Sequence, residues 1–153
     1  MALGNIFDKQ IAEEIIQRIE RLQPDTPALW GKMPVHTMLA HCNVTYEMVY
    51  EEGKHPKPGG FMKLILKLFV KKKVVNDGEY PKNSPTAPQF IIKDERVFET
   101  EKSRLINYIR KTQELGSAYF NNRESHSFGK LSSVEWNNMF YKHLDHHLKQ
   151  FGV

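Results

Sequence analysis

Four long stretches of the sequence repeat apolar residues at intervals of three and four, the spacing that gathers them on one face of an α-helix. These stretches cover residues 5–22, 34–52, 94–115 and 132–150. A helix with one apolar face has to bury that face against other elements. Four such helices in a chain of 153 residues predict an all-α protein with a single domain, residues 1–153, built as a four-helix bundle.

Residues that start and stop helices support these limits. Pro34 suits a first helical position, and Asp94 suits an N-cap. Gly116 favours the left-handed conformation in which many helices end. Ser132 and Glu135 have the spacing of a capping box, in which each side chain binds the backbone N–H of the other residue.

The connection between the second and third helices, residues 53–93, is unusually long. Within it, residues 61–73 predict an extra short helix whose two sides differ. One side carries Leu64, Ile65, Leu68 and Phe69, and the other carries Lys63, Lys67 and Lys71. We expect the apolar side to pack onto the bundle and the lysines to face water. Residues 76–88 predict a loop, as do residues 117–131, and residues 89–92 are the best candidate for a strand.

Composition excludes several classes of protein. The net charge of +4 is modest and no like-charge tail is present, so nucleic acid is not an expected partner. No apolar run approaches the ~20 residues of a membrane-spanning helix, and the first residues do not resemble a signal peptide. The single cysteine, Cys42, excludes a disulfide framework and a four-cysteine zinc module. We therefore expect a cytoplasmic protein with no membrane partner.

The last helix carries a histidine pair with the spacing of a metal site. His143 and His147 are four residues apart, so both project from one face of the helix. That face continues the apolar positions Trp136 and Phe140, which predicts that the pair points inward. Two imidazoles at this spacing can share one metal ion.

The second helix offers a third ligand, His41, at the edge of its apolar face. A bundle that joins these helices would place three imidazoles around one position, an arrangement that suits Zn²⁺, Ni²⁺ or Fe²⁺. The alternative is a group of buried histidines without a metal. Surface or loop positions are expected for the remaining histidines, His36, His55, His126 and His146, and Asp145 is expected in water.

Several motifs resemble the DinB/YfiT-like superfamily. One is the run Trp30-Gly-Lys-Met33, before a helix with Met38-Leu-Ala-His41. Another is the last helix, with Glu135-Trp136 and then His143-x-x-His146-His147-x-x-Gln150. The lead-in at residues 128–132, the loop at residues 83–88 and the chain end at residues 146–152 resemble an uncharacterised, domain-of-unknown-function branch of that superfamily.

The resemblance implies an up-down-down-up four-helix bundle that is often dimeric. It also implies a divalent metal bound by His41, His143 and His147. Relatives include thiol-dependent S-transferases, a maleylpyruvate isomerase and a metal-dependent hydrolase. The long segment 53–93 departs from the shorter connection of many relatives, and it offers a cap for the metal pocket.

Three functions follow as hypotheses. The first is a metal-dependent thiol S-transferase, whose partners are a small-molecule substrate and a low-molecular-weight thiol. A lysine at the rim of the pocket, from Lys130, Lys142 or residues 71–73, would bind the carboxylates of that thiol. The second is a metal-dependent hydrolase with Glu47 or Glu101 as general base. The third is a non-enzymatic metal-binding or scaffold protein. Membrane-surface association through residues 61–73 is the weakest reading, and no catalytic residue besides the metal ligands is assigned.

Overall fold

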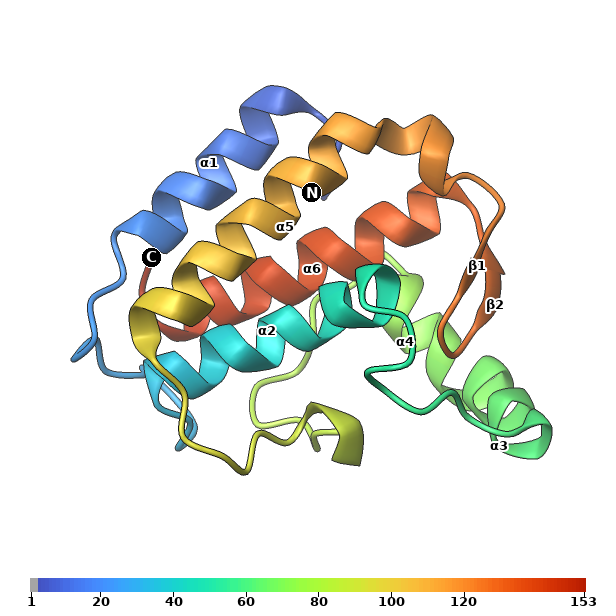
Figure 1. Cartoon of the computed structure of the whole chain (residues 1–153), viewed down its shortest axis with the longest axis horizontal. Helices are drawn as coiled ribbons and strands as arrows, with labels where there is room; N and C mark the ends of the chain where they lie inside the picture. The colour runs from blue at the N-terminus through green and yellow to red at the C-terminus, as the bar shows by residue number, and fades with distance from the viewer. Residues whose placement is uncertain (1–2) are drawn as a thin grey trace.

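The structure is a computed structural model that describes residues 3–153, and it is mostly helical, as expected (Figure 1). The long helices are α1 (Lys9–Glu20), α2 (Val35–Tyr50), α5 (Phe98–Phe120) and α6 (Ser133–Gln150). The connection from α2 to α5 contains α3 (Gly60–Ile65), a π-helical turn (Leu66–Val70), α4 (Lys71–Val75) and a 3₁₀ turn (Pro88–Phe90). No helix in the described part of the chain is both long and apolar enough to cross a bilayer.

The long helices lie side by side and share one core (Figure 1). Helix α5 contacts α1, α2 and α6, and α6 also contacts α1, α2 and α4. Each long helix contributes fully buried side chains from its apolar face, among them Ile16, Leu39, Ile109 and Phe140. Burial of these faces is the main force that holds the helices together.

The helix ends follow the expected signals at some positions and not at others. Ser132 and Glu135 form the predicted capping box at the start of α6. The predicted N-cap Asp94 is wrong: α5 starts after Val97, and the Asp94 carboxylate instead binds Arg96. Gly116 has the left-handed φ of 73° that was expected, but the helix resumes after this kink and ends at Phe120.

Strand predictions from the sequence were also wrong in two places. Residues 89–92 form no strand, because their first half belongs to the 3₁₀ turn. The expected loop 117–131 instead contains an antiparallel pair of short strands, β1 (Arg123–Ser125) and β2 (Gly129–Leu131). Strands of three residues are too short to show the alternation by which strands are recognised.

The apolar side of residues 61–73 does not pack onto the long helices as predicted. Leu64, Leu68 and Phe69 are exposed, and only Ile65 of the predicted apolar side is half-buried. The ammonium groups of Lys63 and Lys71 pair with Glu124 on β1 and Glu135 on α6. The backbone N–H of Lys71 donates to the carbonyl of Leu66, five residues earlier. This π-turn rotates the following residues relative to a regular α-helix, so Leu66, Val70 and Val74 face the protein instead.

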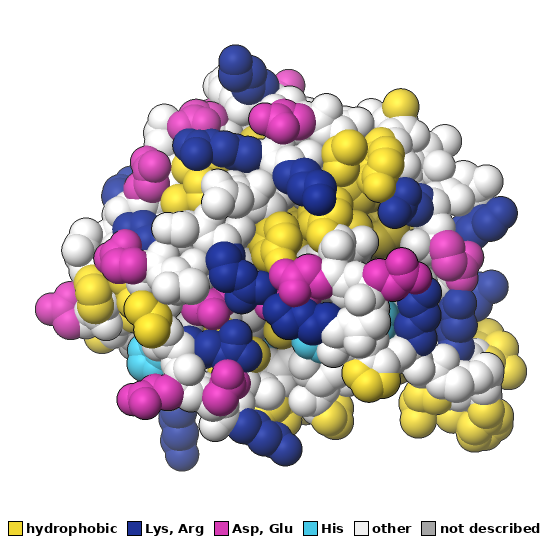
Figure 2. Space-filling model, in the orientation of Figure 1, with side chains coloured by type: hydrophobic (Ala, Val, Ile, Leu, Met, Phe, Trp, Pro, Cys, Tyr) yellow, Lys and Arg dark blue, Asp and Glu magenta, His cyan; other side chains and the backbone are white. Residues whose placement is uncertain are grey.

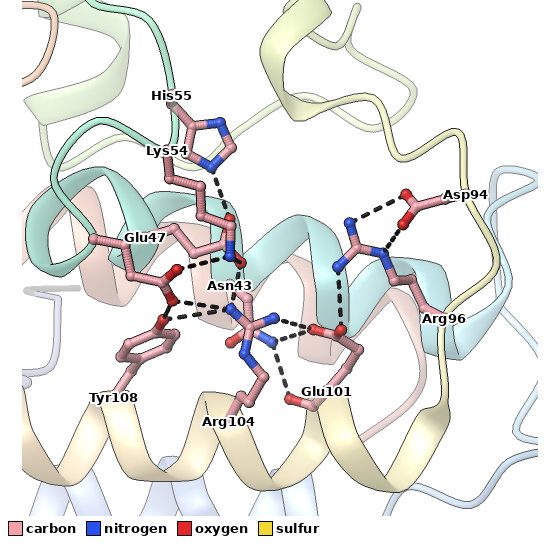
Figure 3. A network of polar contacts seen from close by, with 10 residues as sticks. Asn43, Glu47, Lys54, His55, Asp94, Arg96, Glu101, Arg104 and Tyr108 are labelled. Carbon is pink, nitrogen blue, oxygen red and sulfur yellow. Dashed lines mark hydrogen bonds and ion pairs between the residues drawn. The ribbon is translucent and has the colours of Figure 1, made fainter.

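A network of charged groups ties α2 to α5 (Figure 3). The Arg104 guanidinium donates to Glu101 at 2.9 Å, to Glu47 at 2.5 Å and to Glu51 at 3.1 Å. Burial acts to raise the pKa of Glu47, but hydrogen bonds from His55, Arg104 and Lys54 outweigh it and leave this pKa below its ordinary value. The network therefore holds Glu47 ionised between the two helices.

Candidate metal centre

Three histidines from two helices meet at one point, as the sequence predicts. Helix α2 supplies His41, and one face of α6 supplies His143 and His147. The Nε2 atoms of His41 and His143 are 2.9 Å apart. One ring nitrogen from each residue lies within 4.8 Å of the other two, so the three residues can hold a metal ion.

The outer nitrogens of two of these rings are bound by carbonyl oxygens. His41 Nδ1 lies 3.0 Å from the backbone oxygen of Phe90, and His147 Nδ1 lies 2.8 Å from Gln150 Oε1. The Gln150 amide is oriented because its Nε2 donates to the carbonyl of Trp30. A carbonyl oxygen only accepts, so both rings carry their proton on Nδ1. Their Nε2 lone pairs are left for a metal, the pattern seen in histidine ligands with an outer partner.

The third ring can adopt either neutral form. His143 Nδ1 lies 3.1 Å from the hydroxyl of Thr45, which can accept or donate a hydrogen bond. With the proton on Nδ1, the His143 Nε2 lone pair faces that of His41 at 2.9 Å. Two lone pairs this close repel each other unless a cation binds both or the proton moves to His143 Nε2. The three ring nitrogens therefore fit a metal ion. The Thr45 hydroxyl can hydrogen-bond either neutral form of His143, so it suits the protein both with and without a bound ion.

The surroundings keep all three imidazoles neutral, which is the form that binds metals. Burial, together with the nearby His41, lowers the pKa of His147 to about 3. Burial also lowers the pKa of His143 well below its usual value, although part of this ring faces the cavity. Burial lowers the pKa of His41 despite its hydrogen bond to Phe90.

The histidines lie in the wall of a cavity of about 660 Å³. Most of its lining is apolar, including Met48, Val49, Leu66, Val70, Phe128 and Met139. Residues of the α2–α5 connection close one side, as the length of this segment suggested. Among the described residues that line the cavity there is no Asp or Glu, and Lys32 is the one lysine or arginine.

The other charged candidates from the sequence do not reach this cavity. Glu47 and Glu101 bind arginines in the α2–α5 network. Lys142 is buried and donates to the backbone carbonyls of Lys73 and Asn76 at the end of α4. Lys130 is exposed on β2 and, like Lys142, is absent from the cavity lining.

Cys42 is a buried core residue, as expected. Its thiol faces the sulfur of Met38, and burial raises the pKa of this thiol well above its usual value. Cys42 is also absent from the residues that line the cavity. The protein therefore offers no thiolate of its own at this site.

Two histidines lie closer to the site than the sequence predicts. His146 and His126, expected at surface or loop positions, are half-buried and line the cavity, with His126 in the turn between β1 and β2. The His146 ring packs edge-on against Trp30, with 6.0 Å between ring centroids. Asp145, expected in water, is mostly buried and pairs with Arg18 at 2.8 Å.

The remaining two histidines lie outside the cavity lining. His55 binds the carboxylate of Glu47 at 2.7 Å. His36 is half-buried near the start of α2. Neither belongs to the group of three that can hold a metal.

Sequence reasoning did not assign the outer partners of the ligands. Thr45 follows His41 by four residues, and Gln150 follows His147 by three. Residues three apart are neighbours on a helix surface, so the spacing could have singled out Gln150, which binds His147. Thr45 binds His143 on the other helix, so its distance from His41 along the chain could not have singled it out. Phe90 carried no such signal, because it comes from a 3₁₀ turn far away in the sequence.

Comparison with protein-family models, with curated proteins and with solved structures finds no match to this chain. The fold and site define a mostly helical protein with three histidines in the wall of an apolar cavity. Its chemistry has to be argued from these residues.

Proposed function

We propose that this chain is a divalent-metal-dependent enzyme of the thiol S-transferase type, with its long helices in the up-down-down-up order of the DinB/YfiT-like bundles. The proposal rests on one arrangement: His41, His143 and His147 converge in the wall of an apolar cavity whose described lining includes no carboxylate. Three neutral ligands leave the charge of a divalent ion uncompensated, which favours binding of an anionic group.

A bound divalent ion would lower the pKa of a substrate thiol and so supply a thiolate at neutral pH. The protein's own cysteine is excluded from this role by its burial, so the thiol has to be a second substrate. Lys32, at the cavity lining, offers an ammonium group for a carboxylate of that thiol. The apolar wall binds the other substrate and excludes water from it. The thiol proton would be released to water, the thiolate sulfur would form a bond to an electrophilic carbon, and the leaving group would depart with the bonding electrons.

Hydrolysis has less support than thiol transfer. A metal-dependent hydrolase of the kind considered above needs a carboxylate base beside the bound water. Glu47 and Glu101 are engaged by Arg104 on the α2–α5 side instead. The third possibility, a metal-binding protein without enzymatic activity, is distinguished from thiol transfer by the activity measurement.

Elemental analysis of protein purified without a histidine tag tests the metal site. We expect one divalent ion for each chain, and we expect the ion to be lost in His147→Ala. His36→Ala is the matched control, since His36 lies on α2 outside the ligand group. Equal metal content in both variants would exclude the site.

Activity is tested by following thiol consumption with glutathione or cysteine and 1-chloro-2,4-dinitrobenzene. We expect turnover that disappears on metal removal and in His147→Ala. Lys32→Gln should raise KM for the carboxylate-bearing thiol with little change in kcat, because its role is binding. A metal-loaded protein that consumes none of these thiols would favour the non-enzymatic alternative.

A further inference from the structure

The segment of residues 60–75, here called the connecting segment, exposes a group of large apolar side chains. Phe61 is 78% exposed, Phe69 71% and Leu68 63%. Met62 and Leu64 are also about half exposed. In Figure 2 apolar side chains gather at the lower right, the end of the molecule where Figure 1 shows α3. A contiguous apolar surface of this kind indicates a binding surface in a folded protein.

Lysines without a carboxylate partner lie on the same segment. Lys63 and Lys71 pair with Glu124 and Glu135, but Lys67, Lys72 and Lys73 are exposed and form no ion pair within residues 3–153. Figure 2 shows lysine or arginine side chains beside the apolar group. The surface therefore combines apolar side chains with free positive charge.

We propose that the connecting segment docks on the surface of an anionic lipid bilayer. Phe61, Leu68 and Phe69 would enter the boundary between headgroups and acyl chains, while the three free lysines would bind lipid phosphates. Helical segments with this combination of side chains lie in the plane of the bilayer surface and do not cross it. This inference replaces the sequence-based expectation that the protein has no membrane partner.

Charge complementarity favours a bilayer over a second copy of the chain. A two-fold contact through this apolar group would bring Lys67, Lys72 and Lys73 close to the same residues of the other copy. Like charges brought together in this way oppose association. An anionic bilayer presents the opposite charge to the same lysines, and each basic residue near such a surface adds to the affinity.

The connecting segment also forms part of the cavity wall. Leu66, Val70 and Val74 line the cavity, while Leu68 and Phe69 point outward from neighbouring positions. One short stretch of helix thus lies between the proposed bilayer surface and the apolar interior beside the histidines. Docking itself needs no metal, so its test is independent of the proposed function.

Co-sedimentation with lipid vesicles tests the docking. We expect the protein to bind vesicles of phosphatidylglycerol and phosphatidylcholine, and to bind vesicles of phosphatidylcholine alone much more weakly. Added salt should weaken the binding, since it screens exposed charges. Replacing Lys67, Lys72 and Lys73 together by Gln should lower the affinity about a hundredfold, at about fivefold for each charge removed. Leu68→Ser with Phe69→Ser should lower it about tenfold or more.

A matched control is the pair Lys93→Gln with Val97→Ser. Lys93 is exposed and Val97 is 67% exposed, and Figure 1 shows the start of α5 at the opposite end of the molecule from α3. This pair should bind vesicles like the parent. Thermal unfolding checks that all variants fold.

Three results would overturn the docking proposal. One is equal binding to both kinds of vesicle, and another is an equal loss of binding in the control pair. The third is a dimer in solution that Phe69→Ser dissociates, without any binding to vesicles. That result would assign the apolar group to contact between two copies.

Discussion

At the scale of single residues, the site depends on groups that hold the imidazoles as much as on the imidazoles. The carbonyl partners of His41 and His147 fix their protons on Nδ1, whereas the hydroxyl of Thr45 leaves His143 two neutral forms. When Nδ1 of His143 carries the proton, it donates a hydrogen bond to the Thr45 hydroxyl oxygen. The Nε2 atoms of all three histidines are then free to bind a metal. Thr45 therefore supports the ligand form of His143.

Thr45→Val should lower metal affinity about 10- to 100-fold, the usual effect of removing an outer partner of a ligand. Valine has nearly the same shape but offers no acceptor to His143 Nδ1. Thr45→Ser keeps the hydroxyl and should retain most of the affinity. Competition titration of the metal-free protein with a chromogenic chelator measures both. Equal affinities for Val and Ser would show that the hydroxyl has no role.

The convergence of His41, His143 and His147 could be predicted from the sequence, whereas most of their surroundings could not. Helical spacing alone placed His143 and His147 on one face, because the turn of an α-helix is fixed. The spacing did not place His146, which was expected in water and lines the cavity beside Trp30. His146 lies beside the inward face of α6, and residues outside the helix, such as Trp30, bury it. The position of such loop residues depends on tertiary contacts, which helical spacing does not predict.

At the scale of elements, α2 and α5 are joined by the charged network as well as by apolar packing. Burial acts to raise the pKa of Glu51, but hydrogen bonds from Lys54, Tyr108 and Arg104 outweigh it and lower the pKa from 4.5 to about 2. The folded state thus holds the ionised carboxylate more firmly than the unfolded chain does. Its contribution to stability is present above pH 4.5 and is lost as the pH falls toward 2.

Glu51→Gln should therefore destabilise the protein at pH 7, and the difference from the parent should shrink between pH 4.5 and pH 2. Denaturant unfolding at each pH gives the free energy of unfolding of parent and variant. The contributions of the other titrating groups are the same in both proteins and cancel in the difference. Glu52→Gln is the control, because Glu52 is exposed and has no ion pair within residues 3–153. A difference that stays constant with pH would mean that the ionised form of the Glu51 carboxylate does not contribute to stability.

The elements themselves were predictable where an apolar period ran for several turns. All four long helices were found in this way, with errors of a few residues at their ends, as at Val97. The connecting segment was misjudged for a physical reason. Its lysines and apolar residues were assigned to faces of a regular α-helix, but the π-turn at Leu66–Val70 changes the angle between them.

At the scale of the whole molecule, a bound ion would connect the two halves of the sequence. His41 belongs to α2, and the other two ligands belong to the last helix. An ion that binds only the folded state adds its binding free energy to the stability of the entire fold.

Metal loading should therefore raise the unfolding temperature. At a free ion concentration of 100 times Kd the gain is about 2.7 kcal/mol, which corresponds to about 5 to 10 °C for a protein of this size. Differential scanning calorimetry of chelator-treated protein, with and without added Zn²⁺, measures the shift. His147→Ala should show none of it, and an equal shift in that variant would place the ion elsewhere.

The distance between the ligands along the chain has a consequence for biosynthesis. His41 and His143 are separated by 102 positions, so a ribosome that adds about 5 to 20 residues each second makes them about 5 to 20 s apart. During that interval the nascent chain carries one ligand of three, and such a site holds a metal weakly. An ion that completes the site would therefore bind only once the last helix has been made and has packed against α2, from the cavity that the histidines line. A metal that enters in this manner can also leave, so occupancy in the cell would follow the supply of free ion.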